Sequence, residues 1–138
     1  MSKILAIDYG KVRTGLAETD PYQIIASALD TVLTKDLHTY LNKYLQSEDV
    51  RDIVVGLPMR AHGVPGEIET DIQKLITFLN KNYPDITIHR EDESYTSIRA
   101  SEAIFAAGTK KKKRRDKSLI DRVSATLILQ QFMERNPK

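Results

Sequence analysis

The order of the hydrophobic segments is the feature of this 138-residue chain that most restricts its fold. Three strand-like segments, at residues 3–8, 14–18 and within 24–33, follow one another through short connections, which is typical of an antiparallel meander. Helical and strand-like segments then alternate over the rest of the chain. This order predicts an α/β fold with a mixed β-sheet, in which parallel strands extend the meander and helices cover both faces.

The later segments are recognised by their spacing of apolar residues. The expected helices are residues 37–45, 68–79, 94–107 and 118–134, and the expected strands are residues 52–55 and 85–89. Gly108 fits the position just after the third helix. There is no internal repeat and no linker, so we expect residues 1–138 to form a single domain.

The composition excludes some kinds of site. The chain has no cysteine, so it has neither a disulfide framework nor a thiolate zinc site. Neither a signal peptide nor a run of about 20 apolar residues is present, and we therefore expect a cytoplasmic protein without a membrane partner.

The charge is concentrated in one segment. Residues 110–117 read KKKKRRDK and carry a net charge of +6, whereas the other 130 residues together carry −4. Such a segment indicates a phosphate-binding patch. The alternative is a solvated loop without a ligand.

Asp8 is the carboxylate that ends the first apolar strand. By the two-residue period of a strand it shares a face with Ile4 and Ala6. An unpaired carboxylate on a buried face is costly, so we expect a cation or a basic partner beside it. The alternative is an Asx turn with Gly10 at the corner.

The last expected strand ends in three consecutive acids, Glu91, Asp92 and Glu93. Their carboxylates repel one another unless a cation or a basic partner is near. Simple solvation at the strand end is the alternative, especially for Glu91 and Asp92.

A further acidic position is Asp121, at the start of the last helix. It falls on one helical stripe with Ala125, Ile128 and Phe132, and that stripe should face the sheet. The alternative role for Asp121 is a capping box with Ser118.

Carboxylates gathered from three elements can hold one or two divalent ions, which activate water and stabilise the leaving oxygen of a phosphodiester. Ligands that are all oxygen suit Mg²⁺ or Mn²⁺. The histidines, His38, His62 and His89, show no ligand spacing. The basic segment directly precedes the helix of Asp121, so it is well placed to bind the backbone of a nucleic acid.

Four stretches of the sequence resemble the bacterial YqgF family, also described as RuvX-like or Holliday junction resolvase-like proteins. They are IDYGKVRTGLA at 7–17, IVVGLP at 53–58, EDESYTS at 91–97 and SLIDRVSATLILQQF at 118–132. They follow the family's order and spacing over nearly the whole chain. The resemblance implies a ribonuclease H-like fold and a metal-dependent nuclease of the cytoplasm, whose proposed task is to trim the 5′ end of the 16S ribosomal RNA precursor.

The resemblance also implies roles for single residues. It makes Asp8, Glu93 and Asp121 the catalytic residues and the ligands of Mg²⁺ or Mn²⁺, and it selects Glu93 over its acidic neighbours. The residues expected to bind nucleic acid are Arg13, Lys110, Lys111, Lys112, Lys113, Arg114, Arg115 and Lys117.

One position departs from the family pattern. Ser94 stands where the family has arginine, and Arg99, about one turn later, is a candidate replacement. The glycine that follows Asp8-Tyr9, Gly10, permits close backbone approach, which would help to admit a nucleic acid.

Other functions fit parts of the pattern. One is resolution of branched DNA, which normally requires a symmetric dimer. A second is a non-catalytic RNA-binding factor for ribosome assembly, and a third is an ATP-using enzyme of the actin and sugar-kinase group, for which the chain is short. We expect precursor 16S ribosomal RNA as the main partner, association with ribosomal particles, and a monomer or weak homodimer.

Overall fold

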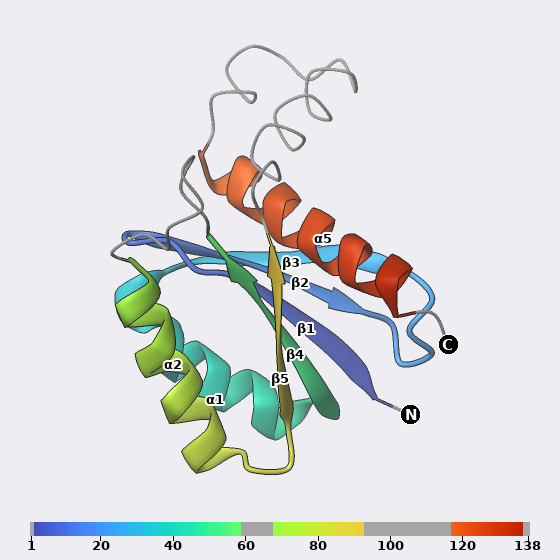
Figure 1. Ribbon diagram of the computed structural model, residues 1–138, viewed down its shortest axis with the longest axis horizontal. Helices are drawn as coiled ribbons and strands as arrows, with labels where there is room; N and C mark the ends of the chain where they lie inside the picture. Colours follow the sequence, from blue (N-terminus) through green and yellow to red (C-terminus); the bar gives the residue numbers. More distant parts are fainter. Residues whose placement is uncertain (1, 59–67, 93–116, 137–138) are drawn as a thin grey trace.

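The computed structural model describes residues 2–58, 68–92 and 117–136, with side chains in the last segment from residue 122 onward. Its described residues form one five-stranded sheet (Figure 1). The strands are β1 (Lys3–Asp8), β2 (Arg13–Thr19), β3 (Ala26–Leu33), β4 (Val50–Leu57) and β5 (Thr87–Asp92). The helices are the short 3₁₀ helix η1 (Thr34–Asp36), α1 (Leu37–Ser47), α2 (Ile68–Asn82) and α5 (Lys117–Arg135).

The strand order in the sheet is β3-β2-β1-β4-β5. The first three strands pair antiparallel, and β4 and β5 extend the sheet in parallel with β1. The carboxyl ends of β1, β4 and β5 therefore meet at one edge of the sheet. This edge is called the carboxyl edge below.

Helices cover both faces of the sheet, with α1 and α2 on one side and α5 on the other (Figure 1). The alternation along β1 explains this arrangement. Leu5 and Ile7 pack into the cluster that includes residues of α1 and α2, whereas Ile4 and Ala6 pack into the cluster that includes residues of α5. Because successive strand residues point to opposite faces, one strand supports both cores.

The predicted mixed sheet with helices on both faces is confirmed, with shifted element boundaries and one additional short helix. The strand expected at 85–89 is Thr87–Asp92, and that expected at 52–55 is the longer Val50–Leu57. The 3₁₀ helix was not predicted. The helix expected at 94–107 and Gly108 lie outside the described residues. In the described part of the chain, no helix is both long and apolar enough to cross a membrane.

Candidate active site

Asp8 stands at the carboxyl edge, at the last position of β1 and opposite Gly15 of β2. It is half-buried. Since Ile4 and Ala6 pack into the cluster under α5, strand alternation puts Asp8 on the same face. The predicted face of Asp8 is therefore confirmed.

The turn after Asp8 is built around Gly10. A Cβ atom at this position would lie 2.1 Å from the carbonyl oxygen of Arg13, so any larger residue forces the backbone to move. The Thr34 hydroxyl donates a hydrogen bond of 2.6 Å to the Gly10 carbonyl oxygen. Gly10 is thus required by the chain's own turn, which holds the end of β1 in place.

Tyr9 faces the opposite side from Asp8. It packs against the cluster under α1 and α2. Burial raises the pKa of the Tyr9 hydroxyl, and the nearby Asp71 carboxylate raises it further. The two neighbours therefore have separate surroundings, and Tyr9 anchors the backbone from which the Asp8 carboxylate extends.

Glu91, near the end of β5, is buried, with only 2% of its surface exposed. Its carboxylate accepts hydrogen bonds from Arg135 at 2.8 and 2.9 Å and from Gln131 at 2.5 Å. Solvation at the strand end is thus the wrong explanation for Glu91. The next residue, Asp92, is exposed. The Glu91 carboxylate is therefore bound by side chains of α5. Glu93 follows β5 and lies outside the described residues.

The end of β4 is held by an ion pair that the sequence analysis missed. Arg90 donates to the carbonyl oxygens of Val55 at 3.2 Å and Gly56 at 3.0 Å. It also donates to both carboxylate oxygens of Glu69, at 2.7 and 2.8 Å. These bonds lower the pKa of the Glu69 carboxyl. The sequence feature that could have indicated this ion pair is Arg90, a basic residue in the middle of a short strand.

Asp121 lies in the second turn of α5, and its side chain is outside the described set. The other members of its predicted stripe, Ala125, Ile128 and Phe132, are buried in the cluster with β1. The amino-terminal end of α5 lies on the same side of the molecule as the carboxyl ends of β1 and β4 (Figure 1). The end of β1 that carries Asp8 and the start of this helix therefore lie on the same side of the molecule (Figure 1).

The predicted nucleic-acid-binding residues are only partly described. Arg13 begins β2 at the carboxyl edge and is half-buried. Residues 110–115 lie outside the described set, and Lys117 is placed as the first residue of α5 without its side chain. Nucleic-acid binding by the basic segment thus stays a prediction.

The described histidines have structural contacts. His89 Nε2 lies 2.9 Å from an Asp52 carboxylate oxygen, and its ring packs against Phe132. His38 stacks on Phe78.

Among the described residues, no group of three His, Cys, Asp or Glu side chains could hold a metal. Asp8, a carboxylate at the carboxyl edge, fits the oxygen donors that Mg²⁺ and Mn²⁺ prefer.

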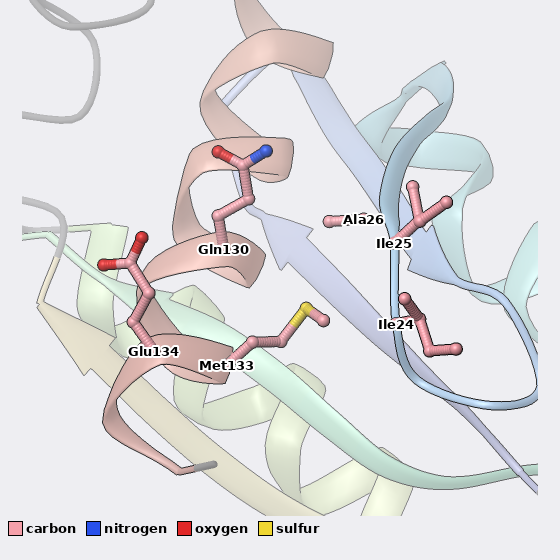
Figure 2. A pocket seen from close by; sticks show the side chains of 6 residues that line it. All are labelled: Ile24, Ile25, Ala26, Gln130, Met133 and Glu134. Atoms are coloured by element: carbon pink, nitrogen blue, oxygen red, sulfur yellow. The ribbon is translucent and has the colours of Figure 1, made fainter. Parts of the chain in front are cut away.

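A surface pocket of about 530 Å³ lies away from this edge. Met133 extends from α5 toward Ile24 across it (Figure 2). The lining residues are Ile24, Ile25, Ala26, Gln130, Met133 and Glu134. Ala26 pairs with the last residue of β2, beside the amino-terminal end of β1, so this pocket is separate from the candidate active site.

A family model described as RuvX, Holliday junction resolvase, matches residues 2–135. The chain belongs to the RuvX family. A relative from Christiangramia forsetii is 44% identical, over 96% of this chain and 98% of its own length. One from Phocaeicola vulgatus is 46% identical, over 97% and 96%. Both relatives bear the name "Putative pre-16S rRNA nuclease".

Two solved structures share the fold of this RuvX-family chain. The Fowlpox virus resolvase, solved with Holliday junction DNA, has a TM-score of 0.61 and 13% identity, covering 99% of both chains. Thermus thermophilus RuvC, also solved with a Holliday junction, has a TM-score of 0.57 and 14% identity, covering 99% of this chain and 97% of its own. The predicted ribonuclease H-like fold is thereby confirmed.

Membership of the RuvX family also confirms the predicted class of enzyme. The chain is a nuclease, a hydrolase of phosphodiester bonds, and its substrate is a nucleic acid.

Proposed function

We propose that this nuclease processes the 5′ end of precursor 16S ribosomal RNA and depends on Mg²⁺ or Mn²⁺. The observation that carries the proposal is identity of 44–46% over nearly the full chain to relatives named for that RNA. The position of Asp8 at the carboxyl edge, on the strand face that Ile4 and Ala6 share, supports the proposal.

The proposed metal ligands and catalytic residues are Asp8, Glu93 and Asp121. Asp8 ends β1, Glu93 follows β5, and Asp121 belongs to the second turn of α5. Divalent metal bound by such carboxylates lowers the pKa of a coordinated water and stabilises a phosphodiester's leaving oxygen. The protein's part is to hold its carboxylates in place. The Gly10 turn and the Tyr9 anchor serve that purpose for Asp8.

The basic residues have a separate role in the proposal. Arg13 and the basic segment, residues 110–117, bind the phosphate backbone and so position the RNA. Residues 1–138 act as a single nuclease domain in the cytoplasm, on RNA carried by ribosomal particles.

The test is cleavage of a labelled precursor 16S RNA fragment in Mg²⁺, in Mn²⁺ and in EDTA. We expect cleavage at the 5′ side of the mature sequence in either metal and none in EDTA. Binding of the RNA without cleavage under all three conditions would contradict the proposal and favour a non-catalytic assembly factor.

Resolution of branched DNA is the second candidate, favoured by the description of the matched family model. Cutting two strands symmetrically normally requires a symmetric dimer. A four-way DNA junction in the same assay separates the candidates. Paired, symmetric cuts in the junction, together with a dimer in solution, would favour resolution over RNA processing.

A further inference from the structure

The turn that joins β1 to β2, residues 9–12, stands at the carboxyl edge directly after Asp8. Lys11, within this turn, is exposed to solvent. Arg13 follows the turn and lies two residues before Gly15, the strand partner of Asp8, so it shares the face of Asp8. The turn and the start of β2 therefore bring basic residues to the edge that carries the candidate catalytic carboxylate.

Thr34, the first residue of η1, binds this turn on both sides of Lys11. Its main-chain N–H donates to the Val12 carbonyl oxygen at 2.8 Å, and its hydroxyl donates to the Gly10 carbonyl oxygen at 2.6 Å. The Thr34 hydroxyl oxygen also lies 2.9 Å from the hydroxyl of Thr14, which is fully buried. Because the one hydroxyl hydrogen of Thr34 is used by Gly10, Thr14 donates this third bond. These three hydrogen bonds are called the Thr34 clip below.

The Thr34 clip fixes the backbone of an exposed turn. Turn tips are commonly among the more mobile parts of a protein. Here Val12 is 61% exposed, yet the carbonyl groups on both sides of Lys11 are hydrogen-bonded. A backbone that is ordered before binding costs less free energy to order when a ligand arrives. The turn therefore presents the Lys11 side chain from a preorganised backbone.

The charge of Lys11 matches a nucleic acid. A lysine ammonium has three N–H donors, and its hydrogen bonds to phosphate oxygens are strengthened by charge. A phosphate that approaches Asp8 is repelled by the carboxylate, and a lysine on the adjoining turn offsets this repulsion. One lysine changes the net charge little, so long-range attraction of RNA is left to residues 110–117, which carry +6. The contribution of Lys11 is a local contact at the carboxyl edge.

We propose that Lys11 binds a backbone phosphate of the RNA beside the candidate active site, and that Thr34 is the positioning residue that presents it. The inference deepens the proposed function and rests on it for the RNA substrate. The observation that carries it is the Thr34 clip, which hydrogen-bonds the carbonyl groups on both sides of an exposed lysine.

The test is the affinity of wild type, Lys11→Gln and Thr34→Val for labelled precursor 16S RNA, measured in EDTA by fluorescence anisotropy at several salt concentrations. EDTA makes the result independent of cleavage. For Lys11→Gln we expect Kd to rise about tenfold. The slope of log affinity against log salt should become smaller in magnitude by about 0.7, the share of one phosphate contact. Thr34→Val keeps the lysine but loses the hydroxyl, so Kd should rise about threefold with a slope near wild type.

Two further variants connect Thr34 to Lys11. Because Thr34 acts through Lys11, the change Lys11→Gln should raise Kd by a smaller factor in Thr34→Val than in wild type. Thr34→Ser keeps the hydroxyl and should restore a Kd near wild type.

Matched controls lie on α2. Lys74→Gln removes another exposed lysine, and Thr77→Val removes a threonine hydroxyl that donates to the Gln73 carbonyl oxygen at 2.9 Å. Both variants should keep the affinity and the salt slope of wild type.

The opposite outcomes are distinct. A wild-type Kd and salt slope in Lys11→Gln would overturn the phosphate contact and leave the proposed function intact. An equal factor for Lys11→Gln in both backgrounds, or a Thr34→Ser variant as weak as Thr34→Val, would make Thr34 a purely structural residue. A wild-type protein that does not bind this RNA would contradict the proposed function, and this inference with it.

Discussion

Three consecutive residues at the end of β1 have different tasks. Asp8 lies on the face under α5, Tyr9 packs into the cluster on the opposite face, and Gly10 makes the turn. The sequence pattern IDYG thus encodes a carboxylate, an anchor and a tight corner. The period of two was enough to predict the face of Asp8, because the preceding strand is regular and apolar.

Gly10→Ala should destabilise the protein by about 2 kcal/mol, since its Cβ would lie 2.1 Å from the Arg13 carbonyl oxygen and the turn would have to move. Urea unfolding of the variant measures this loss. Lys11→Ala, at the exposed neighbour, is the control and should change stability by less than about 0.5 kcal/mol. Equal stability of the two variants would show that the turn tolerates a side chain.

At the scale of elements, α2, β4 and β5 are joined by Arg90. Its guanidinium connects the last residues of β4 with Glu69 in the first turn of α2. Both side chains are about one-fifth exposed, at 23% for Arg90 and 18% for Glu69. This contact supports the carboxyl edge between β1 and β5.

Glu69→Gln should lower the melting temperature at pH 7 and weaken the acid dependence of stability. Arg90 holds the pKa of Glu69 below its ordinary value of 4.5. The stability from this shift is therefore full above pH 4.5 and is lost as the pH falls through the folded-state pKa. The difference in melting temperature between wild type and variant should therefore become smaller as the pH falls through that range.

Melting curves between pH 7 and pH 3 measure this difference. Glu134→Gln, at an exposed site on α5, should follow the wild-type curve throughout. A difference in melting temperature that stays constant down to pH 3 would show that the charge of Glu69 does not stabilise the protein.

The elements also show where sequence reasoning stops. The apolar stripe of Ala125, Ile128 and Phe132 was predicted, because it depends only on local spacing. The burial of Glu91 was not, because its partners Gln131 and Arg135 are 40 or more residues away in sequence. A pattern of charges gives no sign of which acid will meet a base in the fold, so the resemblance to the family was needed to separate Glu93 from Glu91.

At the scale of the whole molecule, positive charge is concentrated in one segment and the rest of the chain is acidic. Residues 110–117 carry +6, while the remaining chain carries −4. Electrostatic attraction for a phosphate backbone should therefore come from one segment, and the acidic remainder should repel nucleic acid bound elsewhere.

Replacing Lys110, Lys111, Lys112 and Lys113 together by glutamine should weaken RNA binding and its dependence on salt. Each phosphate contact of a single strand contributes about 0.7 to the slope of log affinity against log salt, so the slope should fall by up to about 3. Fluorescence anisotropy of labelled RNA at several salt concentrations measures it.

A matched control uses four exposed lysines outside the basic segment, Lys35, Lys43, Lys74 and Lys81, which lie on η1, α1 and α2. Glutamine at these four positions should leave the slope near wild type. Equal slopes for the two quadruple variants would show that net charge, and not the basic segment, attracts the RNA.

The central claim is that the carboxylate at the end of β1 is catalytic, and Asp8→Asn tests it most directly. The measurement is the rate of cleavage of labelled precursor 16S RNA in Mg²⁺, beside Asp36→Asn, an exposed acid of η1, as the control. We predict a loss of about a thousandfold or more for Asp8→Asn, with RNA binding and melting temperature near wild type, and no loss for the control. Cleavage by Asp8→Asn at the wild-type rate would contradict the account.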